Sequence, residues 1–400
     1  QTHSAQAFAH GARKSGLVAR PSTPLHGARA TLLQEARDFF VGPHSNSLHD
    51  RLGTPTRLLH ALAYSRSMST EVARPEPLLE EETGTRKYIL FPIPTSQMSI
   101  WKAYKLQESY FWTAEEIDLT TDRIHFQRDL TDRERHFLSR VLGFFASADL
   151  LICENLLENF SKECQWPTVR AMYGIQGAIE MVHSEVYSKL IDTLVPAREK
   201  ERLFNAIEDI AAVRDKQLWC CQWMDDSKSF ATRLVGFCVF EGLLFSASFC
   251  AIFYFKSRGL MPGLSHANEL ISRDEGLHAS FASMLYVNHV VNKLTDEEVH
   301  DIFRSAVETE RIFVTESVPV SLLGLSADTM MEYVEFCANK LLRQLGHAEL
   351  YPEREECPFD FMRAISVPGQ TNYFERRVSE YRIGVKDLKK THDLAFDEAF

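Results

Sequence analysis

Two Glu-x-x-His segments constrain the fold of this chain more than any other feature. The first is in A-I-E-M-V-H-S-E-V-Y, at Glu180 and His183, and the second in I-S-R-D-E-G-L-H-A, at Glu275 and His278. Helical residues three apart share a face, so each carboxylate would project beside its imidazole. Di-iron and di-manganese bundles use two such helices, and two others that each add one carboxylate. The sequence therefore predicts a helical bundle around two metal ions.

A site with several carboxylates and one imidazole for each metal suits iron or manganese, whereas zinc usually takes sulfur or more imidazole. A third Glu-x-x-His, at Glu297 and His300, stands in T-D-E-E-V-H among charged residues, without an apolar shell. Thr295 can cap a helix at that point. We interpret this third motif as the solvated start of a helix.

Glu241 is the clearest candidate for a third carboxylate ligand. It is the single charged residue in the apolar run from Leu234 to Phe255. That run is long enough to span a membrane, but a helix at the centre of a large core is also apolar all round. An unpaired Glu in lipid would be costly. We therefore predict a buried core helix, and no membrane partner.

The fourth carboxylate should come from the preceding helix, where Asp149, Glu154 and Glu158 are candidates. Asp149 is the acid most embedded in apolar sequence, between F-F-A-S-A and L-L-I-C. A buried carboxylate is costly without a partner, and a metal ion offsets that cost. Asp149 is favoured, although the spacing leaves Glu154 open.

Tyr187 follows His183 by four residues and so lies on the same helix face, about one turn from the predicted metal. An apolar surrounding would keep water and reductants away from a phenol that has lost one electron, as a stored tyrosyl radical requires. Three residues at helical intervals from the ligands face the same layer: Phe245, Phe249 and Ile271.

The remaining sequence predicts an all-α chain, because apolar residues recur at intervals of three and four from Ile100 onward. Thr131 and Glu134 form a plausible capping box. Residues 1–67 are rich in Ser, His, Ala, Arg, Gly and Pro, and we expect a disordered, non-core segment there; an organelle transit segment is the less favoured alternative. We expect an extended arm over 68–99, the bundle over 100–360 and a flexible tail over 361–400. Long helices are expected at about 167–195, 199–224, 228–257, 266–292, 296–320 and 327–346.

Charge and cysteine usage restrict the partners and the compartment. The net charge is −11, and the excess of acids lies after residue 67. An acidic body argues against nucleic acid or an anionic membrane as the main partner. The eight cysteines show no C-x-x-C spacing, which is typical of reduced thiols in a cytoplasmic protein. Nothing near the adjacent pair Cys220 and Cys221 supports a redox role.

Several motifs together resemble one family: E-M-V-H-S-E-V-Y, F-E-G-L-L-F-S-A-S-F, R-G-L-M-P-G-L, A-N-E-L-I-S-R-D-E-G-L-H and Y-F-W-T-A-E-E-I-D-L. They resemble the small, radical-generating subunit of eukaryotic-type class I ribonucleotide reductase, from about Leu90 to Phe400. The resemblance implies a ferritin-like bundle, a homodimer and a large-subunit partner that reduces ribonucleoside diphosphates. It also implies two iron ions, which are oxo-bridged after reaction with dioxygen, and an electron donor that provides electrons to them. Manganese is less favoured.

The resemblance also implies roles for individual residues. Asp149, rather than Glu154, matches the aspartate ligand, and Tyr187 matches the tyrosine that carries the stable radical. The other implied metal ligands are Glu180 and Glu275 as bridging carboxylates, Glu241, His183 and His278. The implied radical-transfer residues are Trp112 and Asp274, which act with His183, and Tyr381 in the tail. The terminal F-D-E-A-F, with Phe396 and Phe400, resembles the peptide that docks on the large subunit.

Two other functions share the ligand pattern. Another oxygen-activating bundle enzyme, such as a desaturase or oxidase, would lack Tyr187 or the docking tail. An iron-storage bundle would be shorter and would lack the aromatic relay.

Overall fold

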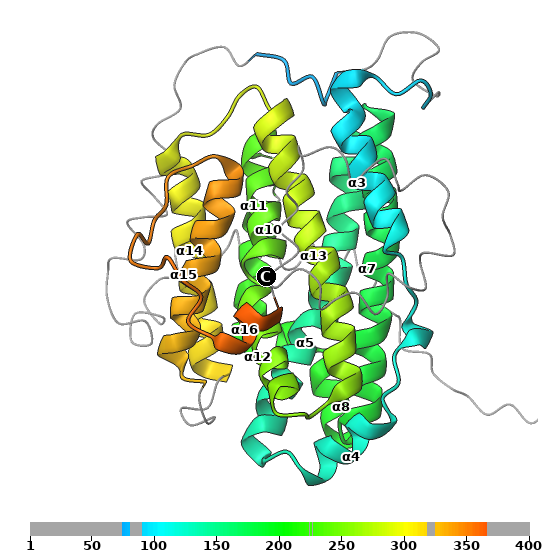
Figure 1. Ribbon diagram of the computed structural model, residues 1–400, viewed down its shortest axis with the longest axis vertical. Helices are drawn as coiled ribbons and strands as arrows, with labels where there is room; N and C mark the ends of the chain where they lie inside the picture. Colours follow the sequence, from blue (N-terminus) through cyan, green and yellow to red (C-terminus); the bar gives the residue numbers. More distant parts are fainter. Residues whose placement is uncertain (1–73, 81–89, 224, 226, 318–324, 366–400) are drawn as a thin grey trace, which may run out of the picture. The chain divides into compact units, whose positions relative to one another are not determined.

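The computed structural model describes residues 74–80, 90–317 except 224 and 226, and 325–365 (Figure 1). The predictions for Tyr381, Phe396 and Phe400 lie outside these residues, as does the prediction for the whole segment 1–67.

The described chain is all-α, as predicted, and contains no β-strand. In Figure 1, α3 (Met98–Ser109) and α7 (Pro167–Leu194) lie side by side, and α13 (Pro262–His289) lies between them and α11 (Phe230–Gly242). The contacts of α5 (Asp132–Asn155) with α7, of α7 with α13 and of α11 with α13 bring the four predicted ligand helices together. The other helices are α4 (Thr120–Arg128), α6 (Ser161–Glu163), α8 (Ala197–Phe204), α9 (Ala206–Asp209), α10 (Ala211–Trp223), α12 (Ser246–Ser257), α14 (Asp296–Ser317), α15 (Ala327–Leu345) and α16 (Asp360–Ile365).

Two of the predicted long helices are interrupted. The segment expected as one helix over 199–224 forms α8, α9 and α10, with non-helical backbone at Asn205 and Ile210. Asn and Asp compete with helical hydrogen bonds, and N-A-I-E-D places both types together. The segment expected over 228–257 is broken after Gly242, directly beyond the predicted ligand Glu241. The apolar pattern did not reveal this second break, because both halves are buried.

The ends of the helices follow local capping signals. Thr131 and Glu134 form the predicted capping box at the start of α5, where the Thr131 backbone N–H donates to Glu134 Oε2 at 2.7 Å. The third Glu-x-x-His begins α14 as expected, because Thr295 and Glu298 cap it and Glu297 pairs with Arg304 at 2.9 Å.

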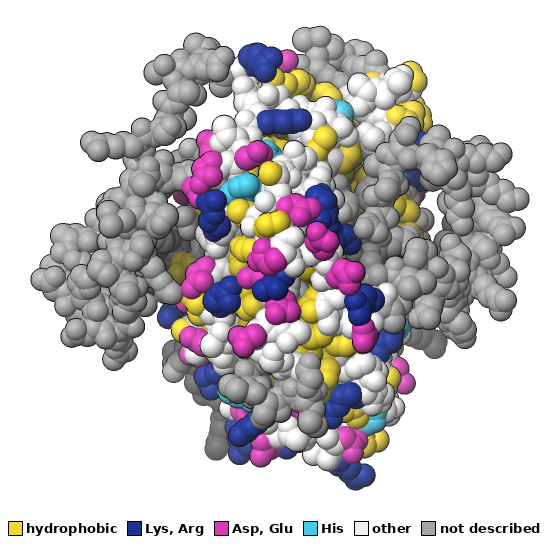
Figure 2. All heavy atoms as spheres, turned by 60° about the vertical axis from the view of Figure 1, so that its left-hand side comes forward, with side chains coloured by type: hydrophobic (Ala, Val, Ile, Leu, Met, Phe, Trp, Pro, Cys, Tyr) yellow, Lys and Arg dark blue, Asp and Glu magenta, His cyan; other side chains and the backbone are white. Residues whose placement is uncertain are grey.

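The two most apolar segments are core elements of the bundle. Asp132–Glu163 and Phe230–Ser257 are long and apolar enough to cross a membrane, but 67% and 100% of their most apolar windows are buried inside the protein. On the face shown in Figure 2, acidic and basic side chains of the described residues are interspersed, so its charge is mixed.

Candidate metal centre

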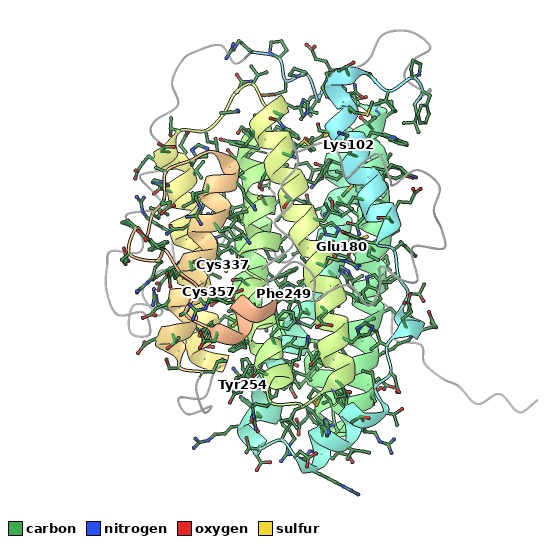
Figure 3. The ribbon with its side chains drawn as sticks, viewed as in Figure 1. Lys102, Glu180, Phe249, Tyr254, Cys337 and Cys357 are labelled. Atoms are coloured by element: carbon green, nitrogen blue, oxygen red, sulfur yellow. The ribbon has the colours of Figure 1, made fainter. Side chains whose placement is uncertain are left out.

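Six predicted ligands come from four helices: Asp149 on α5, Glu180 and His183 on α7, Glu241 on α11, and Glu275 and His278 on α13. All six side chains are fully buried. Figure 3 places Glu180 inside the bundle, where α7 faces α13. Glu154 and Glu158, the two alternatives to Asp149, are only half-buried.

Two carboxylates bridge the two imidazoles. Glu180 Oε1 lies 3.0 Å from His278 Nδ1, and Glu180 Oε2 lies 3.3 Å from His183 Nδ1. Glu275 repeats the arrangement, with Oε1 at 3.1 Å from His183 Nδ1 and Oε2 at 3.2 Å from His278 Nδ1. One ligand atom from each of Glu180, Glu241, Glu275 and His278 lies within 4.8 Å of the others. The Nδ1 atoms of both rings therefore face a common centre.

The polar atoms of this cluster are incompletely satisfied by the protein itself. Both oxygens of Asp149 and of Glu180, Glu241 Oε2 and His183 Nδ1 are buried without a hydrogen bond of good geometry. Burying so many carboxylate oxygens is costly unless cations coordinate them. The donor set, oxygen with one imidazole nitrogen for each ion, fits two hard or borderline divalent ions such as iron or manganese.

In the absence of metal, bound protons would balance the negative charge of the carboxylate cluster. Burial and the negative charge of Glu180 raise the pKa of Asp149 well above its ordinary value, and burial likewise raises the pKa of Glu241. Burial opposes the charged form of His183, yet contacts with Asp274 and Glu180 raise its pKa well above the ordinary value. Metal ions would therefore displace protons when they bind.

Asp274 links the cluster to Trp112. Trp112 Nε1 donates to Asp274 Oδ2 at 2.7 Å, and the same oxygen lies 3.3 Å from His183 Nε2. His183 thus presents Nδ1 to the bridging carboxylates and Nε2 to Asp274. All three side chains are buried. The structure therefore joins the three residues expected to form a relay.

Tyr187 is enclosed by aromatic rings and is only 1% exposed. Its ring stacks on Phe145 at 4.6 Å with an interplanar angle of 6°. Phe145 in turn contacts Phe245 at 5.3 Å and Phe249 at 5.0 Å, and Ile271 is fully buried. The Tyr187 hydroxyl has no hydrogen-bond partner. Its pKa is raised well above the ordinary value, mainly by burial and next by the negative charge of Asp149.

Four residues of the centre were missed by the sequence analysis. Phe145 precedes Asp149 by four residues and Gln176 precedes Glu180 by four, so helical spacing alone places each on a ligand face. Gln176 Nε2 donates to Glu241 Oε1 at 2.9 Å. The other two, Gln107 and Arg273, donate to Asp274 Oδ1 at 3.3 and 3.2 Å. Arg273 is adjacent to Asp274 in sequence, but no sequence signal marks Gln107.

Comparison with known proteins identifies the family. Residues 89–358 match the family model described as ribonucleotide reductase, small chain. The ribonucleoside-diphosphate reductase small chain of Spisula solidissima is 48% identical over 321 residues, which cover 80% of this chain and 82% of that protein. Subunit M2 of the same enzyme from Homo sapiens is 44% identical over 372 residues, covering 88% of this chain and 94% of that protein.

A solved structure agrees with the sequence matches. The ribonucleotide reductase Rnr4 homodimer from Saccharomyces cerevisiae aligns with a TM-score of 0.65 and 34% identity, covering 76% of this chain and 92% of that chain. Fold, ligand cluster and relatives agree, and the chain belongs to the family of ribonucleotide reductase small chains.

Proposed function

We propose that the small-chain function of this protein rests on two iron ions at the cluster and on a stable radical at Tyr187, which is passed to a large subunit. The observation that carries this proposal is the position of Asp274 Oδ2, 2.7 Å from Trp112 Nε1 and 3.3 Å from His183 Nε2. A buried carboxylate shared by a ligand and a tryptophan is a route by which an electron and a proton can leave the centre.

The metal would be held by all six buried side chains: Asp149, Glu180, His183, Glu241, Glu275 and His278. Bound iron would supply the one-electron oxidation by dioxygen, with an external electron donor, that no side chain can perform. The donor set also accepts manganese, and our preference for iron rests on the eukaryotic-type motifs.

Tyr187 is suited to losing one electron and one proton and to remaining oxidised. Its hydroxyl has no competing hydrogen bond, and the aromatic rings around it exclude water. Among charged groups, Asp149 acts most strongly on the Tyr187 pKa. We therefore assign Asp149 as the acceptor for the phenol proton.

Asp274 would keep the outward route connected. Burial raises its pKa, but the charge of Arg273 and hydrogen bonds from His183 and Trp112 hold the pKa below its ordinary value. An ionised Asp274 accepts the Trp112 N–H and orients the imidazole of His183. The Trp112 and His183 rings lie 5.9 Å apart, which keeps the electron path short.

The partners follow from the family. We expect a homodimer, as in the Saccharomyces structure, and a large subunit that reduces ribonucleoside diphosphates. In this scheme Tyr381 receives the oxidising equivalent, while Phe396 and Phe400 dock the tail on the large subunit. We further propose a cytoplasmic location, with organelle targeting by residues 1–67 as the less favoured alternative.

Electron paramagnetic resonance on protein loaded with ferrous iron and exposed to air tests the radical assignment. The parent should give a tyrosyl doublet near the free-electron position, and Tyr187→Phe should abolish it. Tyr173→Phe is the matched control, because Tyr173 lies seven residues before Glu180 as Tyr187 lies seven after, and both are 1% exposed without a hydroxyl partner. This control should keep the doublet.

A doublet that survives in Tyr187→Phe would refute the assignment of the radical to this residue. A parent that binds two irons without any radical would instead favour an oxidase or storage role.

A further inference from the structure

The interruption between α11 and α12 separates the ligand Glu241 from Phe245 and Phe249. Here Leu244 N–H reaches back to Val239 O at 3.2 Å, one residue beyond the α-helical partner. The next residues tighten the chain again, with Ser246 N–H donating to Leu243 O at 3.0 Å. All residues of the break are buried. Backbone groups that lose their helical partners here cannot turn to water and need partners inside the protein.

One buried ion pair supplies these partners on both sides of the break. Lys216 on α10 donates from Nζ to Leu244 O at 2.5 Å and lies 2.7 Å from Glu310 Oε2 on α14. The backbone N–H of Ala247, in the first turn of α12, interacts with the Glu310 carboxylate and favours its charged form. Both ionic side chains are fully buried. The pair therefore connects α10 and α14 to the two ends of the interruption.

The same ammonium group touches the aromatic shell of the centre. Lys216 Nζ lies 3.7 Å from the ring centroid of Phe144 and 4.1 Å from that of Phe313. Phe144 contacts Phe245 edge-on at 5.6 Å. Phe245 in turn contacts Phe145, the ring stacked on Tyr187. Phe144 also contacts Phe145 directly at 5.5 Å, so a single ring lies between the ion pair and the rings that enclose the tyrosine.

A buried ion pair is a poor way to gain stability, because desolvation of both charges offsets much of their attraction, and apolar residues of similar volume often serve as well. Its place at the break requires another explanation. We propose that Lys216 and Glu310 are positioning residues that hold the α11–α12 interruption, and thereby set the place of Glu241 against Phe245, Phe249 and Tyr187. This inference rests on the proposed radical function of Tyr187.

The test compares two variants that separate stability from positioning. In Lys216→Met/Glu310→Leu no charge is left unpaired, so the melting temperature should fall less than in Glu310→Gln, while Leu244 O and Ala247 N–H lose their partners. We expect ferrous iron to bind the metal-free protein at least tenfold more weakly, and the tyrosyl radical to decay at least tenfold faster. Glu310→Gln should show the opposite pattern. Its side chain can still accept the Ala247 N–H, so radical decay should stay within about twofold of the parent, although the uncompensated Lys216 lowers the melting temperature.

A second ion pair, in which Arg233 is buried and Glu163 is partly exposed, provides the control. Arg233 on α11 donates to Glu163 at 2.6 Å but lies away from the break. Arg233→Met/Glu163→Leu should leave iron affinity and radical decay unchanged.

The proposal is overturned if Lys216→Met/Glu310→Leu matches the parent in iron affinity and radical decay, or if iron affinity and radical decay follow the melting temperature across all three variants. Iron affinity of the metal-free protein tests the positioning role even if the parent forms no radical. A failure of the radical proposal is therefore distinguishable from a failure of this one.

Discussion

Replacing Asp274 by Asn should stop radical transfer while leaving radical formation largely intact. The buried carboxylate accepts through Oδ2 from Trp112 at 2.7 Å and lies 3.3 Å from His183 Nε2. Through Oδ1 it accepts from Gln107 at 3.3 Å and from Arg273 at 3.2 Å. An Asn side chain of the same shape has only one oxygen. In either orientation its NH₂ group would face two donors, so two hydrogen bonds are lost.

The size of the effect follows from those two bonds. A hydrogen bond to a charged group contributes about 1.5–3 kcal/mol, so the unfolding free energy should fall by about 3 kcal/mol even if the site relaxes. For a chain of this size that is a fall in Tm on the order of 4–5 °C. Turnover with the large subunit should fall at least 100-fold, or about 2.7 kcal/mol in activation free energy, because Trp112 and His183 no longer share one ionised acceptor.

The assay measures the tyrosyl doublet and ribonucleoside-diphosphate reduction on the same samples. Asp122→Asn is the matched control. Asp122 is also fully buried and accepts two backbone N–H groups, from Gly263 and Leu264, each at 2.8 Å. It should lose stability but retain turnover per radical. Turnover of Asp274→Asn within threefold of the parent, at equal radical content, would refute the reasoning.

Three further predictions concern packing, pH and metal. Gly263→Ala should lower the free energy of unfolding by about 3 kcal/mol in chemical denaturation, because its Cβ would lie 2.2 Å from Asp118 O and would force apart the hydrogen bonds at the start of α13. Gly259→Ala, just before α13, has φ +70° and no atom within 4 Å of the added Cβ, so it should cost only about 1 kcal/mol. Equal costs would contradict the steric argument. Burial lowers the pKa of His289, so as the pH drops below about 6.5 the unfolded chain binds a proton at this residue before the folded chain does, and stability falls. His289→Gln should reduce the fall in Tm between about pH 7.5 and 5.5. An unchanged dependence of Tm on pH would contradict the burial argument. Ferrous iron at 100 times its Kd should stabilise the metal-free protein by about 2.7 kcal/mol, and a chelator should reverse the gain, whereas an unchanged Tm would mean that the buried cluster does not bind the ion.

What the sequence alone determined about this protein is what depends on neighbours within one helix. Glu180 with His183 and Glu275 with His278 were recognisable because three residues nearly complete one helical turn, whatever the helix packs against. The same local reasoning identified the capping box at Thr131 and excluded the solvated pair at Glu297. Its apolar neighbours favoured Asp149, but the spacing left Glu154 open until the family resemblance selected Asp149. The tail residues stay a prediction from that resemblance.

Only the tertiary structure decided which helix faces meet. Trp112 and Asp274 are 162 residues apart, and nothing in the sequence around either residue indicates that their side chains share a hydrogen bond. The same holds for Gln107 beside Asp274 and for Lys216 beside Glu310. Helical periodicity follows from backbone hydrogen bonds four residues apart, whereas the rotation and crossing of helices result from side-chain packing along whole interfaces. For that reason the metal ligands could be read from short motifs, while the relay and the interruption after Glu241 required the packed bundle.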